Sequence, residues 1–268
     1  MSNQEYLIPP VFLGFDTETT GLDVERDRIV QASAVGQDAE GREVFRRDWL
    51  INPGILIPRQ ATKIHGITNE KVAAEGADPA AAVEEIVSVL QRALASGAAL
   101  VVQNAPYDLS LLQAEARRYG VVPLTERRQV APVLDPVMLA RAAGVPGRHG
   151  LAALCSRFGV HNPQAHTAYS DTVTTLEVLR RLLELQELAE LEPAELHEVQ
   201  WEAARVKAKA WEEELRLSSP CARVGVGWPL YGRTRVECDC KDCGRPLGDD
   251  ELDQPCAECR SRYPVAAG

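Results

Sequence analysis

The sequence predicts a layered α/β fold, and two observations carry this prediction. Residues 11–19, 29–35 and 43–51 are short, rich in β-branched and aromatic residues and separated by glycine-containing turns, which is typical of successive strands. Beyond residue 78, strand-like and helical segments alternate. Strands that come first and then alternate with helices favour helices packed on a sheet.

Helix signals justify the elements that follow. Asp78 is a favoured N-cap, Pro79 suits a first helical turn, and Gly97 suits the position just past a helix end. We therefore expect a helix between residues 78 and 97. The other expected elements are a short strand at 100–103, helices at 107–119 and 148–158, a long helix from about residue 170 and a helical segment at 193–217.

The length and composition allow a substantial apolar core. The 268 residues are 45% hydrophobic and 25% charged, which excludes disordered, collagen-like and disulfide-dense secreted chains. The apolar run at 7–15 is too short for a membrane span and lacks the basic flank of a signal peptide. We therefore expect a cytoplasmic protein without a membrane partner.

The net charge of −10 argues at first against a nucleic-acid partner, because phosphate binding is electrostatic. The charge is uneven, however, with −4 over residues 1–171, −5 over 172–220 and −1 over 221–268. Within the first segment, residues 109–170 carry seven arginines against three acidic residues. These arginines, Arg127 and Arg128 among them, are either solvated helix surface or a rim that follows the phosphates of a nucleic-acid strand.

Two carboxylates lie two residues apart on the first expected strand. Asp16 and Glu18, within FDTETTG at 15–21, project from the same face of a strand. Such neighbours repel each other unless a cation neutralises them. A hard divalent ion prefers oxygen ligands of this kind. The alternative is an acidic pair on an exposed strand edge.

Two further segments carry candidate site residues. Asp108, in NAPYD at 104–108, is expected in the first turns of a helix at the carboxyl end of a strand, where ligands collect in open α/β sheets. Its alternative role is to complement the helix dipole. His166 is expected on a loop five residues before Asp171, which opens the long helix. This spacing suits a histidine base beside an anchored carboxylate, although a lone histidine at such a position is more often a capping residue.

Taken in order, these motifs resemble the DnaQ-like family of 3′→5′ exonucleases. The match is to the DEDDh type, which includes the exonuclease domain of the epsilon subunit of bacterial DNA polymerase III. The matching residues are FDTETTG at 15–21, IHGIT at 64–68, NAPYD at 104–108 and His166-x-Ala168-x-x-Asp171, within a resemblance that extends from residue 11 to about residue 180.

The resemblance implies a fold, a reaction and a set of ligands. The fold is an RNase H-like mixed sheet flanked by helices, and the reaction is hydrolysis of terminal phosphodiester bonds of nucleic acid, DNA in the first instance, with release of nucleoside 5′-monophosphates. His166 would be the general base that activates the attacking water. Two Mg²⁺ or Mn²⁺ ions would be bound by Asp16, Glu18, Asp108 and Asp171.

The resemblance also bears on substrate contacts. The backbone around Thr17 and Thr19 is expected to line the 3′-nucleotide pocket with His65 and Asn104. Two positions depart from many relatives, Gln103 in place of histidine and Gln31 in place of glutamate. Neither is a required metal ligand, so the departures bear on substrate preference. Thr167 stands where the tyrosine version of the family has its tyrosine, which favours the histidine assignment.

Five cysteines crowd the end of the chain, between residues 238 and 259. Cys240 with Cys243 and Cys256 with Cys259 form two C-x₂-C pairs, and this spacing suits one tetrahedral structural Zn²⁺. A tail this short could not hold itself together by apolar burial alone. Cys238 lies close enough to be a substitute ligand.

We therefore expect three parts: an exonuclease domain at 1–190, a helical connector at 191–220 and a zinc-ribbon-like module at 221–268. The connector should pack through Trp201, Ala204, Ala208, Trp211 and Leu215 on its own domain or on a twin. Cys155 and Cys221 are expected to be a core thiol and a linker thiol.

The expected partners are the 3′ end of nucleic acid or a single strand, together with a polymerase or repair protein. An exoribonuclease with the same site is one alternative. A non-catalytic adaptor that binds nucleic acid or a polymerase is the other. The presence of all five site residues speaks against the adaptor. The oligomeric state stays open.

Overall fold

The computed structural model describes residues 10–217, 222–232 and 234–236. The chain divides into two compact units, Met1–Trp201 and Glu202–Gly268. Each unit is described by itself below, and the predicted three-part division remains a prediction.

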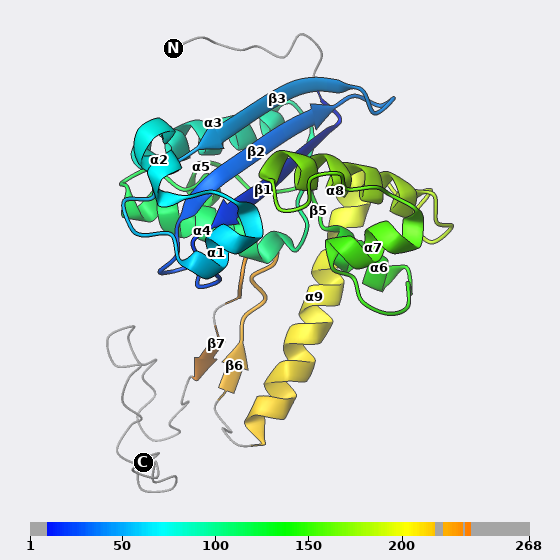
Figure 1. Ribbon diagram of the computed structural model, residues 1–268. Coiled ribbons are helices and arrows are strands. Elements are labelled where there is room, and N and C mark those ends of the chain that lie inside the picture. The colour runs from blue at the N-terminus through cyan, green and yellow to red at the C-terminus, as the bar shows by residue number, and fades with distance from the viewer. Residues whose placement is uncertain (1–9, 218–221, 233, 237–268) are drawn as a thin grey trace, which may run out of the picture. The chain divides into compact units, whose positions relative to one another are not determined.

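The first unit is built on a five-stranded mixed sheet, which confirms the predicted sheet flanked by helices (Figure 1). The strand order is β3-β2-β1-β4-β5. The first three strands pair antiparallel, whereas β4 and β5 run parallel to β1. The strands are β1 (Phe12–Thr19), β2 (Ile29–Gln37), β3 (Glu43–Leu50), β4 (Ala99–Val101) and β5 (Val133–Leu134).

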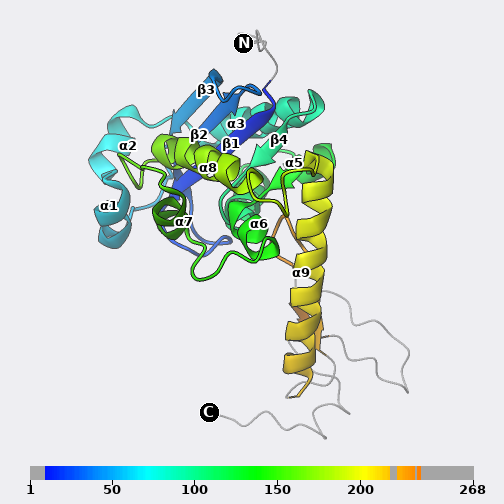
Figure 2. The same cartoon turned by 90° about the vertical axis from the view of Figure 1, so that its right-hand side faces the viewer.

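Helices cover both faces of this sheet, with α8 on one face and α3 on the other (Figures 1 and 2). Asp78 caps α3 by accepting the N–H of Ala81 at 2.9 Å, as predicted. The helices of the first unit are α1 (Arg59–His65), α2 (Asn69–Glu75), α3 (Pro79–Ala95), α4 (Ala105–Arg118), α5 (Leu124–Arg127), α6 (Pro136–Ala142), α7 (Leu151–Phe158) and α8 (Ala168–Leu183), followed by α9 (Pro193–Arg216), which runs into the second unit.

The central strand β1 faces a different helix on each side. One face of the strand carries every second residue, including Gly14, Asp16 and Glu18, and this face lies against α8. A Cβ atom at Gly14 would lie 2.7 Å from Cγ2 of Thr172 and 2.9 Å from Cδ1 of Leu176. Since position 14 has no side chain, α8 can lie close to β1 beside the two carboxylates.

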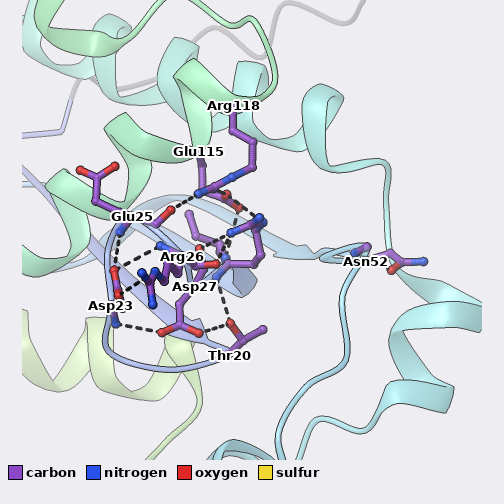
Figure 3. Close-up of polar contacts among 11 residues, drawn as sticks. Thr20, Asp23, Glu25, Arg26, Asp27, Asn52, Glu115 and Arg118 are labelled. Atoms are coloured by element: carbon purple, nitrogen blue, oxygen red, sulfur yellow. Dashed lines mark hydrogen bonds and ion pairs between the residues drawn. The ribbon is translucent and has the colours of Figure 1, made fainter. Parts of the chain in front are cut away.

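The turn between β1 and β2 is fastened by polar contacts (Figure 3). Asp27 accepts the hydroxyl of Thr20 at 2.7 Å and the backbone N–H of Asp23 at 2.8 Å. Glu115 of α4 is 1% exposed, accepts the N–H of Ile29 at 3.3 Å and forms an ion pair with Arg118. The turn that follows Asp16 and Glu18 is therefore fixed to α4.

The first turns of α9 cover the edge of β5. His197 Nδ1 accepts the N–H of Val133 at 3.0 Å. Gln200 accepts the N–H of Asp135 at 2.7 Å through Oε1 and donates to the carbonyl of Val133 at 3.1 Å through Nε2. These side chains satisfy backbone groups that an open sheet edge would leave unpaired.

The side chains of α9 that are buried in the described chain lie near its start, and the stripe expected to pack on its own domain or on a twin is only partly covered. Leu196, His197 and Gln200 are the buried residues of the helix. Trp201 is 39% exposed and Trp211 is 48% exposed within the described chain. The stripe expected to pack therefore presents both of its tryptophans to the surface of the described structure.

In the second unit, β6 (Ala222–Val224) pairs antiparallel with β7 (Thr234–Val236). The N–H of Val224 donates to Glu212 at 2.9 Å, which ties β6 to the end of α9. Cys155 is a buried free thiol, as predicted. The remaining cysteines lie outside the described residues, so the zinc site stays a prediction; they are Cys221, Cys238, Cys240, Cys243, Cys256 and Cys259.

No helix in the described ranges combines the length and the apolar character that crossing a membrane requires.

Candidate active site

Three of the predicted carboxylates meet between β1 and α8. Asp16, Glu18 and Asp171 each offer an oxygen, and these oxygens all lie within 4.8 Å of one another. Asp16 and Glu18 lie side by side because strand residues two apart share a face. Asp171 joins them because it lies in the first turn of α8, which Gly14 allows close to β1.

The fourth carboxylate arrives from the opposite side of the strand. Asp108 lies in the first turn of α4, as predicted, and is 4% exposed. The hydroxyl of Thr17 donates to its Oδ1 at 2.5 Å. Thr17 therefore holds Asp108 at the end of β1, although Asp108 is not part of the 4.8 Å group.

Burial and mutual repulsion perturb these carboxylates. Burial, together with repulsion from Asp171 and Asp108, raises the pKa of Glu18 to about 7. Burial likewise raises the pKa of Asp16 well above its usual range, with added repulsion from Asp108, Asp171 and Glu18. The pKa of Asp108 is also raised by burial, and the Thr17 hydrogen bond opposes that shift.

This arrangement fits a divalent cation. In the described part of the chain, none of the ion pairs involves these four carboxylates. Crowded carboxylates without a basic partner favour the uptake of protons or of a hard metal ion. The donor set consists of carboxylate oxygens, which Mg²⁺ and Mn²⁺ prefer.

Asp171 is held by a residue that the sequence did not single out. The side-chain amide of Asn162 donates to its Oδ1 at 2.5 Å, and Ser170 in turn donates to Asn162 at 2.7 Å. The backbone N–H of His166 donates to Oδ2 at 3.0 Å. An asparagine in a loop carries no local sequence signal for such a role, because the role depends on how the loop folds back.

His166 lies on the loop before α8, as predicted, and its side chain is exposed. Its φ of 67° is in the left-handed region, which few non-glycine residues adopt. His65 ends α1 and is 8% exposed. Burial lowers the pKa of His65, the backbone of Thr19 opposes this shift, and His166 lowers it further. The two imidazoles are thus near enough to repel when charged.

The predicted threonines of the nucleotide pocket contact α4. Thr19 donates to the carbonyl of Gly21 at 2.7 Å and lies 2.8 Å from the hydroxyl of Tyr107. Thr17 contacts Asp108, as described above. Asn104 is exposed and has φ 57° and ψ 50°, again the left-handed region. The structure therefore brings Asn104 to the start of α4, directly before the carboxylate site.

The two departures from relatives both hold backbone near the site. Gln31 accepts the N–H of Ala168, the first residue of α8, at 3.1 Å. Gln103 donates to the carbonyl of His149 at 3.0 Å.

Arg127, one of the arginines considered for a phosphate-following rim, forms an ion pair with Glu84 of α3 at 2.7 Å. Its guanidinium therefore joins two helices.

The alignment of residues 13–179 with a family model described as exonuclease decides which family this is, because the match covers more than half of the chain. The chain belongs to the exonuclease family. The predicted resemblance to DnaQ-like exonucleases is confirmed. All of the carboxylates, His65 and His166 lie inside the matched segment.

Two relatives of this chain are named for the epsilon subunit of DNA polymerase III. The chain is 41% identical over 180 residues to a DNA polymerase III subunit epsilon-like protein of Rhodobacter capsulatus, which covers 64% of this chain and 23% of the relative. It is 35% identical over 176 residues to the DNA polymerase III subunit epsilon of Treponema pallidum, which covers 64% of this chain and 76% of the relative. The match thus spans under a quarter of the first protein and three quarters of the second.

Solved structures of exonuclease I share the fold. An E. coli exonuclease I in complex with a dT13 oligonucleotide superposes with a TM-score of 0.57 at 22% identity, over 66% of this chain and 41% of that one. The enzyme of Methylocaldum szegediense superposes with a TM-score of 0.58 at 24% identity, over 75% and 44%. The chain spans less than half the length of either protein, and at these identities the likeness concerns the fold.

Proposed function

We propose that this exonuclease is a metal-dependent 3′→5′ enzyme of the DEDDh type that acts on DNA and releases nucleoside 5′-monophosphates. The observation that carries the proposal is the group of three carboxylates from β1 and α8, with Asp108 of α4 near enough to raise the pKa of two of them and with no ion pair to any of the four in the described chain. Metal-assisted phosphodiester hydrolysis needs such a cage.

In this proposal, different residues bind the metal ions, orient the carboxylates and accept the proton of the attacking water. Asp16, Glu18, Asp108 and Asp171 would hold two Mg²⁺ or Mn²⁺ ions. When bound, these ions supply positive charge that stabilises the phosphate oxygens as charge develops on them. Thr17 orients Asp108, and Asn162 orients Asp171. His166 accepts the proton of the attacking water, a role that suits an exposed imidazole on a loop beside the carboxylates.

The substrate and partner proposals rest on the relatives. The exonuclease I structures include complexes with oligonucleotides, and of the relatives named above one is an epsilon subunit of DNA polymerase III and the other an epsilon-like protein. We infer that the 3′ end of a single DNA strand is the substrate and that a DNA polymerase is the partner. RNA trimming by the same site is the alternative.

One experiment tests direction, substrate and chemistry together. DNA and RNA oligonucleotides labelled at the 3′ or the 5′ end are incubated with the protein in Mg²⁺ or Mn²⁺, beside Asp16→Ala. We expect the wild-type protein to release the 3′ label as a mononucleotide and to shorten the 5′-labelled strand stepwise. Asp16→Ala should lose at least about 100-fold in rate, because one cage ligand is gone.

Glu75→Gln, a surface change at the end of α2, serves as the control and should cleave like the wild type. If the wild-type protein and Asp16→Ala were equally inert on every substrate, the adaptor alternative would replace the enzyme. Release of ribonucleotides alone would favour the exoribonuclease instead.

The second proposed metal is a structural Zn²⁺ bound by Cys240, Cys243, Cys256 and Cys259. We expect purified protein to contain about one zinc per chain, because two C-x₂-C pairs close a tetrahedral thiolate site. The double variant Cys240→Ser/Cys243→Ser should lose this zinc, measured by elemental analysis, whereas Cys155→Ser should keep it. Zinc content equal to the wild type in the double variant would contradict the site.

A further inference from the structure

Asp135 is a buried carboxylate directly after β5, outside the four-carboxylate cage. Its exposed fraction is 1%. Its Oδ1 accepts the N–H of Asn104 and the N–H of Val137, each at 2.9 Å, and its Oδ2 accepts the N–H of Ala105 at 3.2 Å. One side chain therefore satisfies backbone donors at the start of α4 and at the start of α6.

All three of these contacts require acceptor oxygens. Burial raises the pKa of Asp135 to about 6, and the three backbone N–H groups oppose the shift. The three N–H donors reach both oxygens, and a carboxylate can accept at both of them. An asparagine would turn one of these acceptors into an NH₂ group facing a backbone N–H.

The start of α4 is where this support matters. Asn104 adopts φ 57° and ψ 50° immediately before the helix, a left-handed conformation that most non-glycine residues avoid and that asparagine adopts more readily than most of them. The side chain of Asp135 accepts hydrogen bonds from the backbone N–H groups of Asn104 and Ala105, and these bonds stabilise the left-handed conformation of Asn104. Asp108 follows three residues after Ala105, in the same helical turn.

The other side of Asp135 is anchored to α9. Its own N–H donates to Gln200 Oε1 at 2.7 Å, and the same glutamine contacts the carbonyl of Val133. A continuous set of hydrogen bonds therefore runs from α9 through the end of β5 to the first turn of α4.

We propose that Asp135 is a positioning residue that sets Asp108 for metal binding by fixing the left-handed turn at Asn104, with Gln200 holding Asp135 in place. This inference rests on the proposed function, in which Asp108 helps to hold divalent ions. Groups that orient metal ligands typically contribute 10- to 100-fold to metal affinity or activity.

The test uses the full chain and two measurements, Mn²⁺ binding from the loss of the free-ion EPR signal and single-turnover cleavage of a 5′-labelled oligonucleotide. Asp135→Asn should weaken Mn²⁺ binding and slow cleavage by about 10- to 100-fold. The matched control is Asp38→Asn, since Asp38 also accepts backbone N–H groups, of Glu40 at 3.1 Å and Arg42 at 2.8 Å. Asp38 lies next to Gln37, which pairs with Phe12 at the far end of β1, so its variant should bind Mn²⁺ normally.

A rescue separates positioning from general destabilisation. Glycine adopts the left-handed conformation readily, so Asn104→Gly placed in the Asp135→Asn background should recover at least about threefold of the lost Mn²⁺ affinity. Gln200→Met, which keeps a similar shape and removes both contacts to β5, should weaken Mn²⁺ binding more mildly. If Asp135→Asn does not fold, the Mn²⁺ affinity of Gln200→Met tests the proposal in its place.

The two possible failures differ in their pattern. Wild-type Mn²⁺ affinity and cleavage in both Asp135→Asn and Gln200→Met, beside an inactive Asp16→Ala, would overturn the positioning role and leave the proposed function standing. The positioning role is likewise overturned if Asp135→Asn is weakened and glycine at position 104 restores nothing. A wild-type protein that neither binds Mn²⁺ nor cleaves would overturn the proposed function, and the inference with it.

Discussion

Asp16 and Glu18 are charged residues in surroundings that oppose their charge. Their neighbours are other acids, and burial removes the water that would solvate them. In the absence of a cation, binding a proton removes the unfavourable charge of each carboxyl, and this is why their pKa values are raised. Protons and divalent ions therefore compete for the same oxygens.

This competition predicts a pH-dependent effect of metal on stability. The folded pKa of Glu18, about 7, lies above its ordinary value of 4.5, so the metal-free fold binds this proton more tightly than the unfolded chain does. The stabilisation is present below pH 4.5 and is lost as the pH rises through 7. We expect Mg²⁺ to raise the Tm more at pH 8 than at pH 5.5, measured by differential scanning fluorimetry.

Glu18→Gln removes the charge and keeps the shape. In EDTA at pH 8 it should stabilise the fold by roughly 1–3 kcal/mol and should lose the Mg²⁺-dependent rise in Tm. Glu75→Gln, on the exposed end of α2, should change neither quantity. A Glu18→Gln protein that is less stable than wild type in EDTA at pH 8 would show that the carboxylate is not strained.

The four carboxylates could be predicted at the scale of residues because each lies in a short motif. Asn162, Asp135 and Gln200 could not. Their contacts join residues that are 9, 30 or more, and 65 positions apart in the chain. Nothing in the local pattern of an asparagine, an aspartate and a glutamine indicates which distant backbone or side-chain group each will meet.

At the scale of elements, β1 joins the site because its two faces meet two helices. Asp16 and Glu18 point towards α8, and Thr17 points towards Asp108 of α4. The alternation of a strand thus brings carboxylates from both layers of helices to the same end of β1. The three leading strands and the helix after Asp78 could be predicted from composition and caps, whereas the two-residue β5 is too short to give a pattern.

Gly14 is the residue on which this convergence depends. Gly14→Ala would place a Cβ atom 2.7 Å from Thr172, so α8 must move away from β1 and carry Asp171 with it. We expect a loss of about 1–3 kcal/mol in the free energy of unfolding. Mn²⁺ affinity and cleavage should also fall, since metal sites tolerate little displacement of a ligand.

Gly150→Ala provides the control, because no atom lies within 4 Å of a Cβ built there and its φ of −63° suits alanine. Because Gly150 is the N-cap of α7, where alanine is a poorer cap, we expect a cost of up to about 1 kcal/mol and no change in Mn²⁺ affinity. Equal stability and equal Mn²⁺ affinity in the two alanine variants would show that α8 does not depend on the missing side chain.

At the scale of the whole molecule, the division at residue 201 places the start of α9 with the sheet. The sequence located a helix at 193–217 correctly, but the two tryptophans of its apolar stripe are exposed in the described chain, so packing of this stripe on a second copy stays a prediction. His197 and Gln200 are buried for a different reason, which is that they satisfy the edge of β5.

Truncation tests this division. A chain ending at Trp201 keeps the contacts to β5, whereas a chain ending at residue 190 leaves the N–H groups of Val133 and Asp135 without their partners on α9. We expect the shorter chain to lose roughly 2–4 kcal/mol in the free energy of unfolding relative to the chain ending at 201. Urea denaturation followed by circular dichroism measures both. Equal midpoints would mean that α9 adds nothing to the sheet.

The helix α4 is restrained near both of its ends. Asp135 holds its first residues, and near its last turn Glu115 binds the β1–β2 turn. A helix held at two points resists both tilting and sliding, so we expect Asp108 to keep its position when a metal ion or a ligand binds.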